Sequence, residues 1–212
     1  MKDKLHSPLT MTRWKGKQRR IGITGGIATG KSTVSKFLYE IKNIPIIDAD
    51  QLSQAILAPN TESTKLVLQH FGNKIRNKNY DSINRNALGQ IIFSNPNEKY
   101  WLESIIHPII INNIYEGLEK LKNKPSVILT MPLLFETNLT DLCSEIWLIN
   151  CTKTQQIKRL MQRDRLNEEE ALLRINSQWS LERKKDLADV IIDNTSTKEK
   201  CIQEIEYHLS RI

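Results

Sequence analysis

The sequence predicts an α/β fold in which helices cover both faces of a parallel, doubly wound sheet of five strands. Short apolar segments typical of buried strands alternate along the chain with longer segments of helical periodicity. The first of these strands ends in a glycine-rich loop that leads into an amphipathic helix. Strands that alternate with helices form parallel sheets, because the helices serve as crossover connections.

The expected strands are recognised by their runs of isoleucine, leucine and valine. They cover Arg19–Thr24, Ile44–Ile47, Val127–Met131, Ile146–Asn150 and Val190–Ile192. The expected helices of the same core cover Lys31–Ile41, Thr154–Arg163 and Lys198–Ser210. The first helix carries apolar residues at intervals of three and four, so one of its faces should be buried against the sheet.

Two intervals between these strands are not simple connections. The interval 51–124 shows helical patterns but no clear strand, whereas a crossover needs only about a dozen residues. We therefore expect a mostly helical insertion with a core of its own. Its core candidates are Leu66, Leu68, Phe71, Ile91, Ile92, Phe93, Trp101, Leu102, Ile105 and Ile106. The interval 164–183 is charge-dense and has few apolar residues, so we expect a poorly anchored segment that suits a mobile lid.

The domain organisation follows from these intervals. One domain should span 19–212, with a core formed by 19–50, 125–163 and 184–212, an insertion at 51–124 and a lid at 164–183. Residues 1–18 form a basic tail that we expect to be disordered. The tail is either a solvated extension or a weak electrostatic anchor for a polyanion.

Charge and composition exclude several classes of protein. The net charge is +7, but seven of the 31 basic residues and only one of the 24 acidic residues lie in the first 20 positions, so the rest of the chain is nearly neutral. This argues against a nucleic-acid-binding core. The longest apolar stretches, 105–111 and 127–135, fall short of the roughly 20 residues of a membrane span, so we expect no membrane contact. The three cysteines have no metal or disulfide spacing, which favours a reducing cytoplasm.

The strongest functional signal is the segment Gly25–Ser32, which reads GGIATGKS. It fits the pattern G-x-x-x-x-G-K-[ST] and lies between a predicted strand and a predicted helix, as in the three-layer fold of phosphate-loop nucleotide-binding proteins. Such a loop points successive backbone N–H groups at phosphate oxygens. The expected ATP-binding residues here are Gly26, Ala28, Thr29, Gly30, Lys31, Ser32 and Thr33. Lys31 should neutralise the β- and γ-phosphates, and the Ser32 hydroxyl should be a Mg²⁺ ligand.

A pair of carboxylates, Asp48 and Asp50, follows the second predicted strand. Ligands bind at the carboxyl ends of parallel strands, so this pair should lie at the same edge as the phosphate loop. If the strand geometry continues, both side chains point the same way. We assign Asp50 as the base that accepts a proton from an attacking hydroxyl and Asp48 as the metal-side acid. The alternative is that either residue caps the helix that follows.

A third signal is the cationic end of the helix predicted over Thr154–Arg163. Arg159 and Arg163 lie four residues apart, on one face, directly before the predicted lid. Arginines in such a place stabilise the negative charge of a phosphoryl group during its transfer, and we expect Arg163 to be the more important of the two. The alternative is an ordinary solvated basic face.

These signals together indicate a small-molecule kinase. The guanine-binding pattern N-K-x-D and the switch pattern D-x-x-G of GTPases are both missing from the sequence. Two alternatives remain. One is a kinase of the nucleoside monophosphate type that acts on a different hydroxyl or phosphate. The other is a nucleotide-regulated binding module that uses the basic tail on a polyanion.

The chain resembles the dephospho-CoA kinase family over nearly all of residues 20–210. The phosphate loop is shared with many proteins, but the combination of further motifs is more specific. The matching pieces are Asp48-Ala49-Asp50, Phe71-Gly72, Arg85 with Leu88, His107-Pro108, Pro132-Leu133-Leu134-Phe135-Glu136, Gln156, Arg159, Arg163, Gln178, Ala188-Asp189 and Asn194.

The resemblance implies a parallel five-stranded core, a helical CoA-binding part and a lid. It implies that ATP phosphorylates the 3′-hydroxyl of the ribose of dephospho-CoA, with Mg²⁺, in a cytoplasmic enzyme that is a monomer or a small homo-oligomer. By the same resemblance, Asp50 is the base and Asn194 borders the adenine of ATP. The acceptor-binding residues would be Asp50, Arg85, His107, Leu133, Phe135 and Glu136, with Gln178 from the lid side.

Three of these residues also have simpler interpretations. His107-Pro108 could end a helix, Phe135 could be a core residue, and Arg85 could be a surface helix residue. The chain also departs from the family pattern at Thr130, where many members carry Asp, so we assign no metal role to the third strand. In the phosphate loop, Ala28 and Thr29 replace a frequent Gly and Ser, and we expect both to face outward.

Overall fold

A sheet of five parallel strands lies at the centre of the protein. The computed structural model describes residues 13–77 and 81–210. The strands are β1 (Arg19–Thr24), β2 (Ile46–Asp48), β3 (Ser126–Thr130), β4 (Glu145–Asn150) and β5 (Val190–Asp193). Their order across the sheet is β2-β3-β1-β4-β5, and every pairing is parallel. The prediction of a five-stranded parallel sheet is confirmed.

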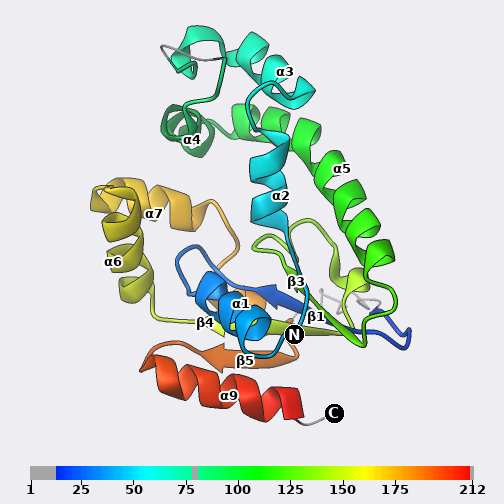
Figure 1. The fold of residues 1–212 in the computed structure, drawn as a ribbon. Coiled ribbons are helices and arrows are strands. Elements are labelled where there is room, and N and C mark those ends of the chain that lie inside the picture. The colour runs from blue at the N-terminus through cyan, green and yellow to red at the C-terminus, as the bar shows by residue number, and fades with distance from the viewer. Residues whose placement is uncertain (1–12, 78–80, 211–212) are drawn as a thin grey trace, which may run out of the picture.

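The helices of the core cover two faces of this sheet (Figure 1). On one face, α1 (Lys31–Glu40) and α9 (Lys198–Ser210) pack with buried side chains from β1, β4 and β5. On the other face, the carboxyl half of α5 (Pro96–Lys120) and the segment 131–143 pack on β3 and β4. Since β3 and β4 are covered on both faces, their middle residues, Val127–Leu129 and Ile146–Ile149, are continuous apolar runs rather than an alternating pattern.

The second strand begins two residues later than expected. β2 covers Ile46–Asp48, whereas the sequence predicted a start at Ile44. Pro45 precedes the strand and has no N–H group to donate, although its carbonyl oxygen still accepts a hydrogen bond from the Ile128 N–H at 2.9 Å. Pro45 therefore bonds to the neighbouring strand β3 through its carbonyl oxygen alone, and the strand itself begins at Ile46.

The helical insertion has its own hydrophobic core. It consists of α2 (Ala49–Ile56), α3 (Glu62–Phe71), a 3₁₀ turn (η1, Gly72–Lys74), α4 (Arg85–Ser94) and the first half of α5. Within the described part of the insertion, the only strand-like pairing is one isolated bridge between Arg76 and Ile83. Most core candidates are buried or partly buried there, but Leu66 is 48% exposed, because it lies on the outer face of α3.

Helix α5 joins the insertion to the sheet. Its amino half packs in the core of the insertion, and its carboxyl half contributes Ile114 and Leu118 to the core beneath the sheet. Pro108 lies inside this 25-residue helix. The alternative that His107-Pro108 ends a helix is therefore wrong.

The remaining elements are α6 (Lys153–Asp164), α7 (Glu168–Asn176), α8 (Leu181–Lys185) and a second 3₁₀ turn (η2, Thr140–Leu142). Helices α6 and α7 begin with reciprocal capping boxes, Thr152 with Gln155 and Asn167 with Glu170. Helices α6 and α7 stand beside the phosphate loop, and α7 faces the insertion (Figure 1).

The segment 164–183 is anchored more firmly than its charged composition suggested. Arg174 of α7 is ion-paired with Asp164 at 2.8 Å and lies 5.2 Å from the ring centre of Phe93 in α4. Lys99 of α5 donates a hydrogen bond to the Ser177 carbonyl oxygen at 2.9 Å. These contacts connect the segment to the insertion by side chains that are far apart in sequence, which composition does not reveal.

The described end of the basic tail is also ordered. The Trp14 N–H donates to the Cys143 carbonyl oxygen at 2.9 Å, and the Gln18 amide donates to the Leu121 carbonyl oxygen at 2.7 Å. Arg20 stacks on the Trp14 ring at 3.6 Å. The prediction of disorder over 1–18 is therefore wrong for 13–18, while residues 1–12 lie outside the described residues.

Candidate active site

The phosphate loop connects β1 to α1 and has the conformation that its glycines allow. Gly30 is the residue before α1 and has φ of 105°, in the region that favours glycine. Ala28 has φ of 59°, which is unusual for a residue with a side chain. Thr29 is fully buried, and its hydroxyl donates to the Gly26 carbonyl oxygen at 2.9 Å. The expectation that Thr29 faces outward is therefore wrong, because its side chain closes the loop from inside.

Lys31 folds back under this loop. Its ammonium donates to the carbonyl oxygens of Gly25 and Gly26 at 3.2 and 2.7 Å, and the residue is only 8% exposed. Burial lowers the pKa of Lys31 to about 8, and the nearby carboxylate of Asp50 opposes this shift. The loop thus holds a cation whose protein partners are neutral carbonyl oxygens.

The two carboxylates after β2 do not share a strand. Helix α2 begins at Ala49, and the Asp48 Oδ1 atom accepts hydrogen bonds from the N–H groups of Asp50 and Gln51 at 2.9 and 3.2 Å. The expectation that strand geometry continues through Asp50 is wrong, and Asp48 caps the helix as in the alternative interpretation. Both residues nevertheless line the same cavity of about 810 Å³, together with Ser32 and Arg163.

Asp50 lies where three cavities meet. It lines the cavity just described, a cavity of about 340 Å³ around the phosphate loop, and a third of about 310 Å³ under the helical insertion. Desolvation by the surrounding protein raises the pKa of Asp50, Lys31 opposes the rise, and Asp48 adds to it. A group placed in this way can accept a proton from a molecule that reaches the phosphate loop from the insertion side.

The third cavity is mostly apolar, and only some of the predicted acceptor-binding residues line it. His107, Leu133 and Gln178 line it, with Phe93 and Ile106 from the insertion. Phe135 is 4% exposed and belongs to the core beneath the sheet, as in its simpler interpretation. Arg85 is an exposed residue of α4 that donates to the Gln54 carbonyl oxygen at 3.0 Å, so it does not line this cavity.

Glu136 is likewise not a lining residue. Its Oε1 atom accepts a hydrogen bond from the Trp179 N–H at 3.0 Å and is 2.8 Å from the ammonium of Lys184. Glu136 therefore faces the Trp179 backbone and the Lys184 side chain, away from this cavity.

Arg159 of α6 contacts the backbone of the phosphate loop. Arg159 donates to the carbonyl oxygens of Thr29 and Asn194 at 3.5 and 3.2 Å, and the Asn194 amide donates to the Thr29 oxygen at 2.8 Å. Arg159, Asn194, Gly30 and Thr33 line a cavity of about 310 Å³. This cavity is also lined by residues of α9, and Arg159 and Gly30 line the phosphate-loop cavity as well.

Arg163 lines the phosphate-loop cavity together with Lys31 and Asp50. Its guanidinium binds Asp164 through two hydrogen bonds of 2.7 and 3.1 Å. This interaction raises the pKa of Arg163 and lowers the pKa of Asp164. Arg163 therefore brings a fixed positive charge to the site at the start of the expected lid.

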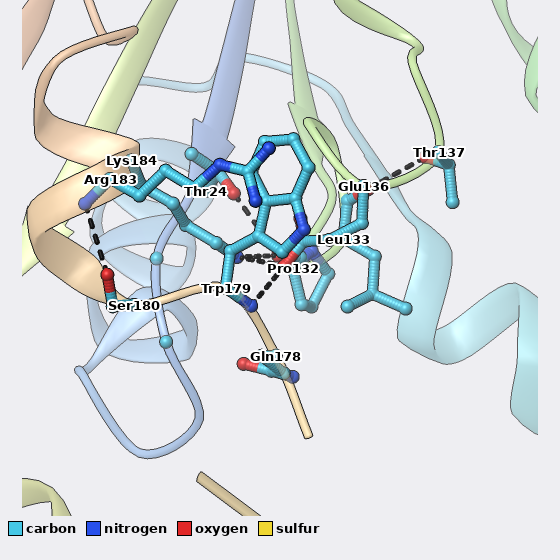
Figure 2. Close-up of polar contacts among 12 residues, drawn as sticks. Thr24, Pro132, Leu133, Glu136, Thr137, Gln178, Trp179, Ser180, Arg183 and Lys184 are labelled. Carbon is cyan, nitrogen blue, oxygen red and sulfur yellow. Dashed lines mark hydrogen bonds and ion pairs between the residues drawn. The ribbon is translucent and has the colours of Figure 1, made fainter. Parts of the chain in front are cut away.

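Sequence reasoning missed Lys184, the second buried lysine near the site. It is fully buried in α8, and its ammonium donates to the Pro132 carbonyl oxygen at 2.8 Å and contacts Glu136 (Figure 2). In the sequence it stands in the run Arg183–Lys185, which has the composition of a solvated surface. No local signal separates Lys184 from its neighbours, because its burial depends on the loop after β3.

Two glutamines bracket the backbone of Ile27 in the phosphate loop. The Gln178 Oε1 atom accepts from the Ile27 N–H at 3.0 Å, and the Gln156 amide donates to the Ile27 carbonyl oxygen at 2.7 Å. Gln178 precedes α8, and Gln156 belongs to α6. The loop is thus held from both sides by side chains that the resemblance had named.

Two further observations concern metals and membranes. Among residues 13–77 and 81–210, no group of three or more His, Cys, Asp or Glu side chains could hold a metal ion by itself. In the same part of the chain, no helix combines the length and the apolar character that crossing a membrane requires.

Comparison with known proteins places this geometry in one family. The family model described as dephospho-CoA kinase matches residues 19–199. A dephospho-CoA kinase of Prochlorococcus marinus is 48% identical over 199 residues, which is 92% of this chain and 95% of that protein.

Two solved structures are similar in fold and sequence. A dephospho-CoA kinase from Campylobacter jejuni is 31% identical with a TM-score of 0.60, over 89% of this chain and 96% of the other. A protein from Thermus thermophilus is 28% identical with a TM-score of 0.75, over 93% of this chain and 99% of the other. The chain belongs to the dephospho-CoA kinase family.

Proposed function

We propose that the protein transfers the γ-phosphoryl group of ATP to the 3′-hydroxyl of the ribose of dephospho-CoA. The products are coenzyme A and ADP, and the reaction is the last step of coenzyme A synthesis. The observation that carries the proposal is the position of Asp50, which lines both the phosphate-loop cavity and the apolar cavity under the insertion. An acceptor in the apolar cavity would present its hydroxyl at the carboxylate beside the phosphates.

The residues around Asp50 suit a phosphoryl transfer. Asp50 accepts the proton of the attacking hydroxyl, and its raised pKa makes it a better proton acceptor than an ordinary aspartate. Lys31 and Arg163 supply positive charge on the phosphate side of the same cavity, where negative charge must be stabilised during transfer. On binding ATP, the Lys31 ammonium exchanges loop carbonyl oxygens for phosphate oxygens.

The donor set near Asp50 fits Mg²⁺. This ion prefers oxygen ligands and is usually held by one or two carboxylates together with substrate phosphates and water. The Ser32 hydroxyl and the Asp48 carboxylate lie in one cavity, and Asp48 uses only Oδ1 to cap α2. When bound, the ion would neutralise part of the phosphate charge. Thr130 of β3 is buried and shares a hydrogen bond of 2.9 Å with the Ser35 hydroxyl, so we propose no metal role there.

The other assignments are part of the same proposal. We place ATP across the loop, with its adenine near Asn194 and Arg159, and dephospho-CoA under the insertion 51–124, against His107, Leu133 and Gln178. Segment 164–183, which begins directly after Arg163, serves as the lid that brings Gln178 to the phosphates. A cytoplasmic location is proposed because all three cysteines are free thiols.

The proposal is tested by ADP release from Mg-ATP by the purified protein. Dephospho-CoA is compared with AMP, CMP, pantetheine and no acceptor, and the product is identified by mass and by its 3′-phosphate. Release with dephospho-CoA alone supports the proposal. Release with a nucleoside monophosphate instead favours the other kinase class, and tight ATP binding with no release favours a nucleotide-regulated binding module.

A further inference from the structure

Lys184 is the most completely buried charged residue in the described part of the chain. It is 0% exposed, whereas Lys31, the other buried lysine, is 8% exposed. Its ammonium donates to the Pro132 carbonyl oxygen and pairs with Glu136 Oε1, both at 2.8 Å. Burial lowers the pKa of Lys184, and Glu136 opposes that shift. The side chain is not among the residues assigned to ATP or to the acceptor, so its position needs another explanation.

Three segments of the active site meet at this ammonium (Figure 2). The Pro132 carbonyl oxygen also accepts a hydrogen bond from the hydroxyl of Thr24, the last residue before the phosphate loop, at 3.3 Å. Glu136 Oε1 also accepts from the Trp179 N–H at 3.0 Å. Lys184 and Glu136 therefore connect the end of β1, the segment that follows β3, and the linker between α7 and α8.

Stability alone is a poor explanation for this ion pair. A buried pair loses its hydration, and replacing both members by uncharged residues of similar size is often neutral or stabilising. The pair is also incompletely satisfied, because Glu136 Oε2 is buried and has no hydrogen-bond partner among the described residues. A matched uncharged pair that keeps an acceptor for the Trp179 N–H would fill the space without these costs.

The pair is connected to Gln178 through the backbone of the linker. Trp179, whose N–H is held by Glu136, directly follows Gln178 in the chain. Gln178 reaches from this fixed point to the Ile27 N–H of the phosphate loop at 3.0 Å. Its side chain lines both the acceptor cavity and the phosphate-loop cavity. A shift of the linker would break the contact to Ile27 and change the wall that both cavities share.

We propose that Lys184 and Glu136 are a positioning pair that holds Gln178 between the phosphate loop and the acceptor cavity. The inference rests on the proposed function, since Gln178 matters for turnover only if both substrates meet there. Lys184 and Glu136 touch neither substrate, and they act through Gln178. Glu136 accordingly supports the acceptor site without lining it.

The test compares three variants with the wild-type protein. In K184M/E136Q the charges are removed together, while an amide oxygen remains for the Trp179 N–H. Q178A removes the side chain through which the pair acts, and the triple variant combines the two changes. The matched control is R19M/E145Q, which removes the ion pair of 2.6 Å between the starts of β1 and β4, both side chains 16% exposed. Should K184M/E136Q fail to fold, E136Q alone replaces it.

Two readouts are used, and only one depends on the reaction. Amide hydrogen exchange of Ile27 should accelerate about tenfold or more in K184M/E136Q and in Q178A, but not in the control. The kcat/KM for dephospho-CoA should fall on the order of tenfold in each, because a displaced wall misaligns the acceptor. The triple variant should be no worse than about threefold beyond Q178A, since the two changes act through one contact.

Several results would overturn the inference. One is a loss of kcat/KM in the triple variant that equals the product of the losses in K184M/E136Q and in Q178A. Another is a K184M/E136Q variant with a lower melting temperature but wild-type kcat/KM and Ile27 exchange, which is the result expected of the control. If the wild-type protein does not phosphorylate dephospho-CoA, the proposed function fails, and the Ile27 exchange then decides the positioning role by itself.

Discussion

Replacing Gly30 by alanine should weaken both the fold and the binding of ATP. Gly30 has φ of 105°, and a Cβ atom there would lie 2.1 Å from the Asn194 amide nitrogen. The side chain of Asn194 must then move, which breaks its hydrogen bond of 2.8 Å to the Thr29 carbonyl oxygen. The substitution therefore combines backbone strain with the loss of a contact that holds the phosphate loop.

The magnitude follows from these two effects. A residue with a side chain in a sparsely populated backbone region costs about 1–3 kcal/mol, and a broken hydrogen bond adds about 1 kcal/mol. The sum of roughly 2–4 kcal/mol corresponds to a fall in melting temperature of about 5–15 °C for a chain of this size. If the loop relaxes to escape the strain, ATP must restore it on binding, so roughly 1–3 kcal/mol is lost from binding and Kd rises about 5–150-fold.

The assay is a thermal unfolding curve together with ATP titration by calorimetry. Gly72→Ala is the matched control, because Gly72 has φ of 63° but no atom within 4 Å of the added Cβ, and it lies in the insertion. It should lower the melting temperature while leaving the ATP affinity unchanged. In Gly30→Ala/Asn194→Ala the clash is gone, while the strain and the loss of the Asn194 hydrogen bond remain. Because that bond can be lost only once, the loss in the double variant should be smaller than the sum of the single losses. Wild-type stability and ATP affinity in Gly30→Ala would refute the reasoning.

Three further predictions concern the chemistry of the site and the thiols. Lys31→Ala should lower turnover on the order of 10²–10⁴-fold by removing charge stabilisation in the transition state, and near-normal steady-state turnover would contradict the site assignment. Asp50→Asn should lower turnover on the order of 10²–10⁴-fold while ATP affinity stays within about threefold, because the loss is in proton acceptance; a collapse of ATP binding in calorimetry would instead place Asp50 with the metal. Burial raises the pKa of Cys143 to about 12 and also raises the pKa of Cys151 and of Cys201. A disulfide reagent at pH 8 should therefore react slowly with these thiols until the protein is unfolded, and fast reaction of all three in the native protein would refute this.

The sheet and the phosphate loop could be predicted because their signals are local. A buried parallel strand consists of a continuous apolar run, and the loop combines glycines with a lysine at fixed spacing. The start of α2 was also predictable, since Asp48 stands where helix-capping residues stand, but the strand interpretation competed with it. Both interpretations used the same two carboxylates and differed only in whether the backbone after Asp48 is extended or helical.

The remaining features depend on contacts between distant segments. Phe135 and Glu136 belong to the same motif, yet Phe135 lies in the core and Glu136 contacts Lys184, because the turn after β3 directs successive side chains to different places. The anchoring of 164–183 rests on partners such as Phe93 and Lys99, far away in the chain. A composition rich in charge predicts exposure, and it does not reveal which charges find such partners.

The order of the strands also has a consequence for synthesis on the ribosome. β1 is central in the sheet, but its neighbours are β3 and β4, and Arg19 is in register with Ser126. At about 5–20 residues per second, the first strand waits roughly 5–20 s before its first partner has been made. Over that interval the helices of the insertion, whose contacts are mostly among themselves, can already form. The nascent chain thus carries an unpaired apolar strand joined to a nucleotide loop that stays incomplete until the second half of the protein has emerged.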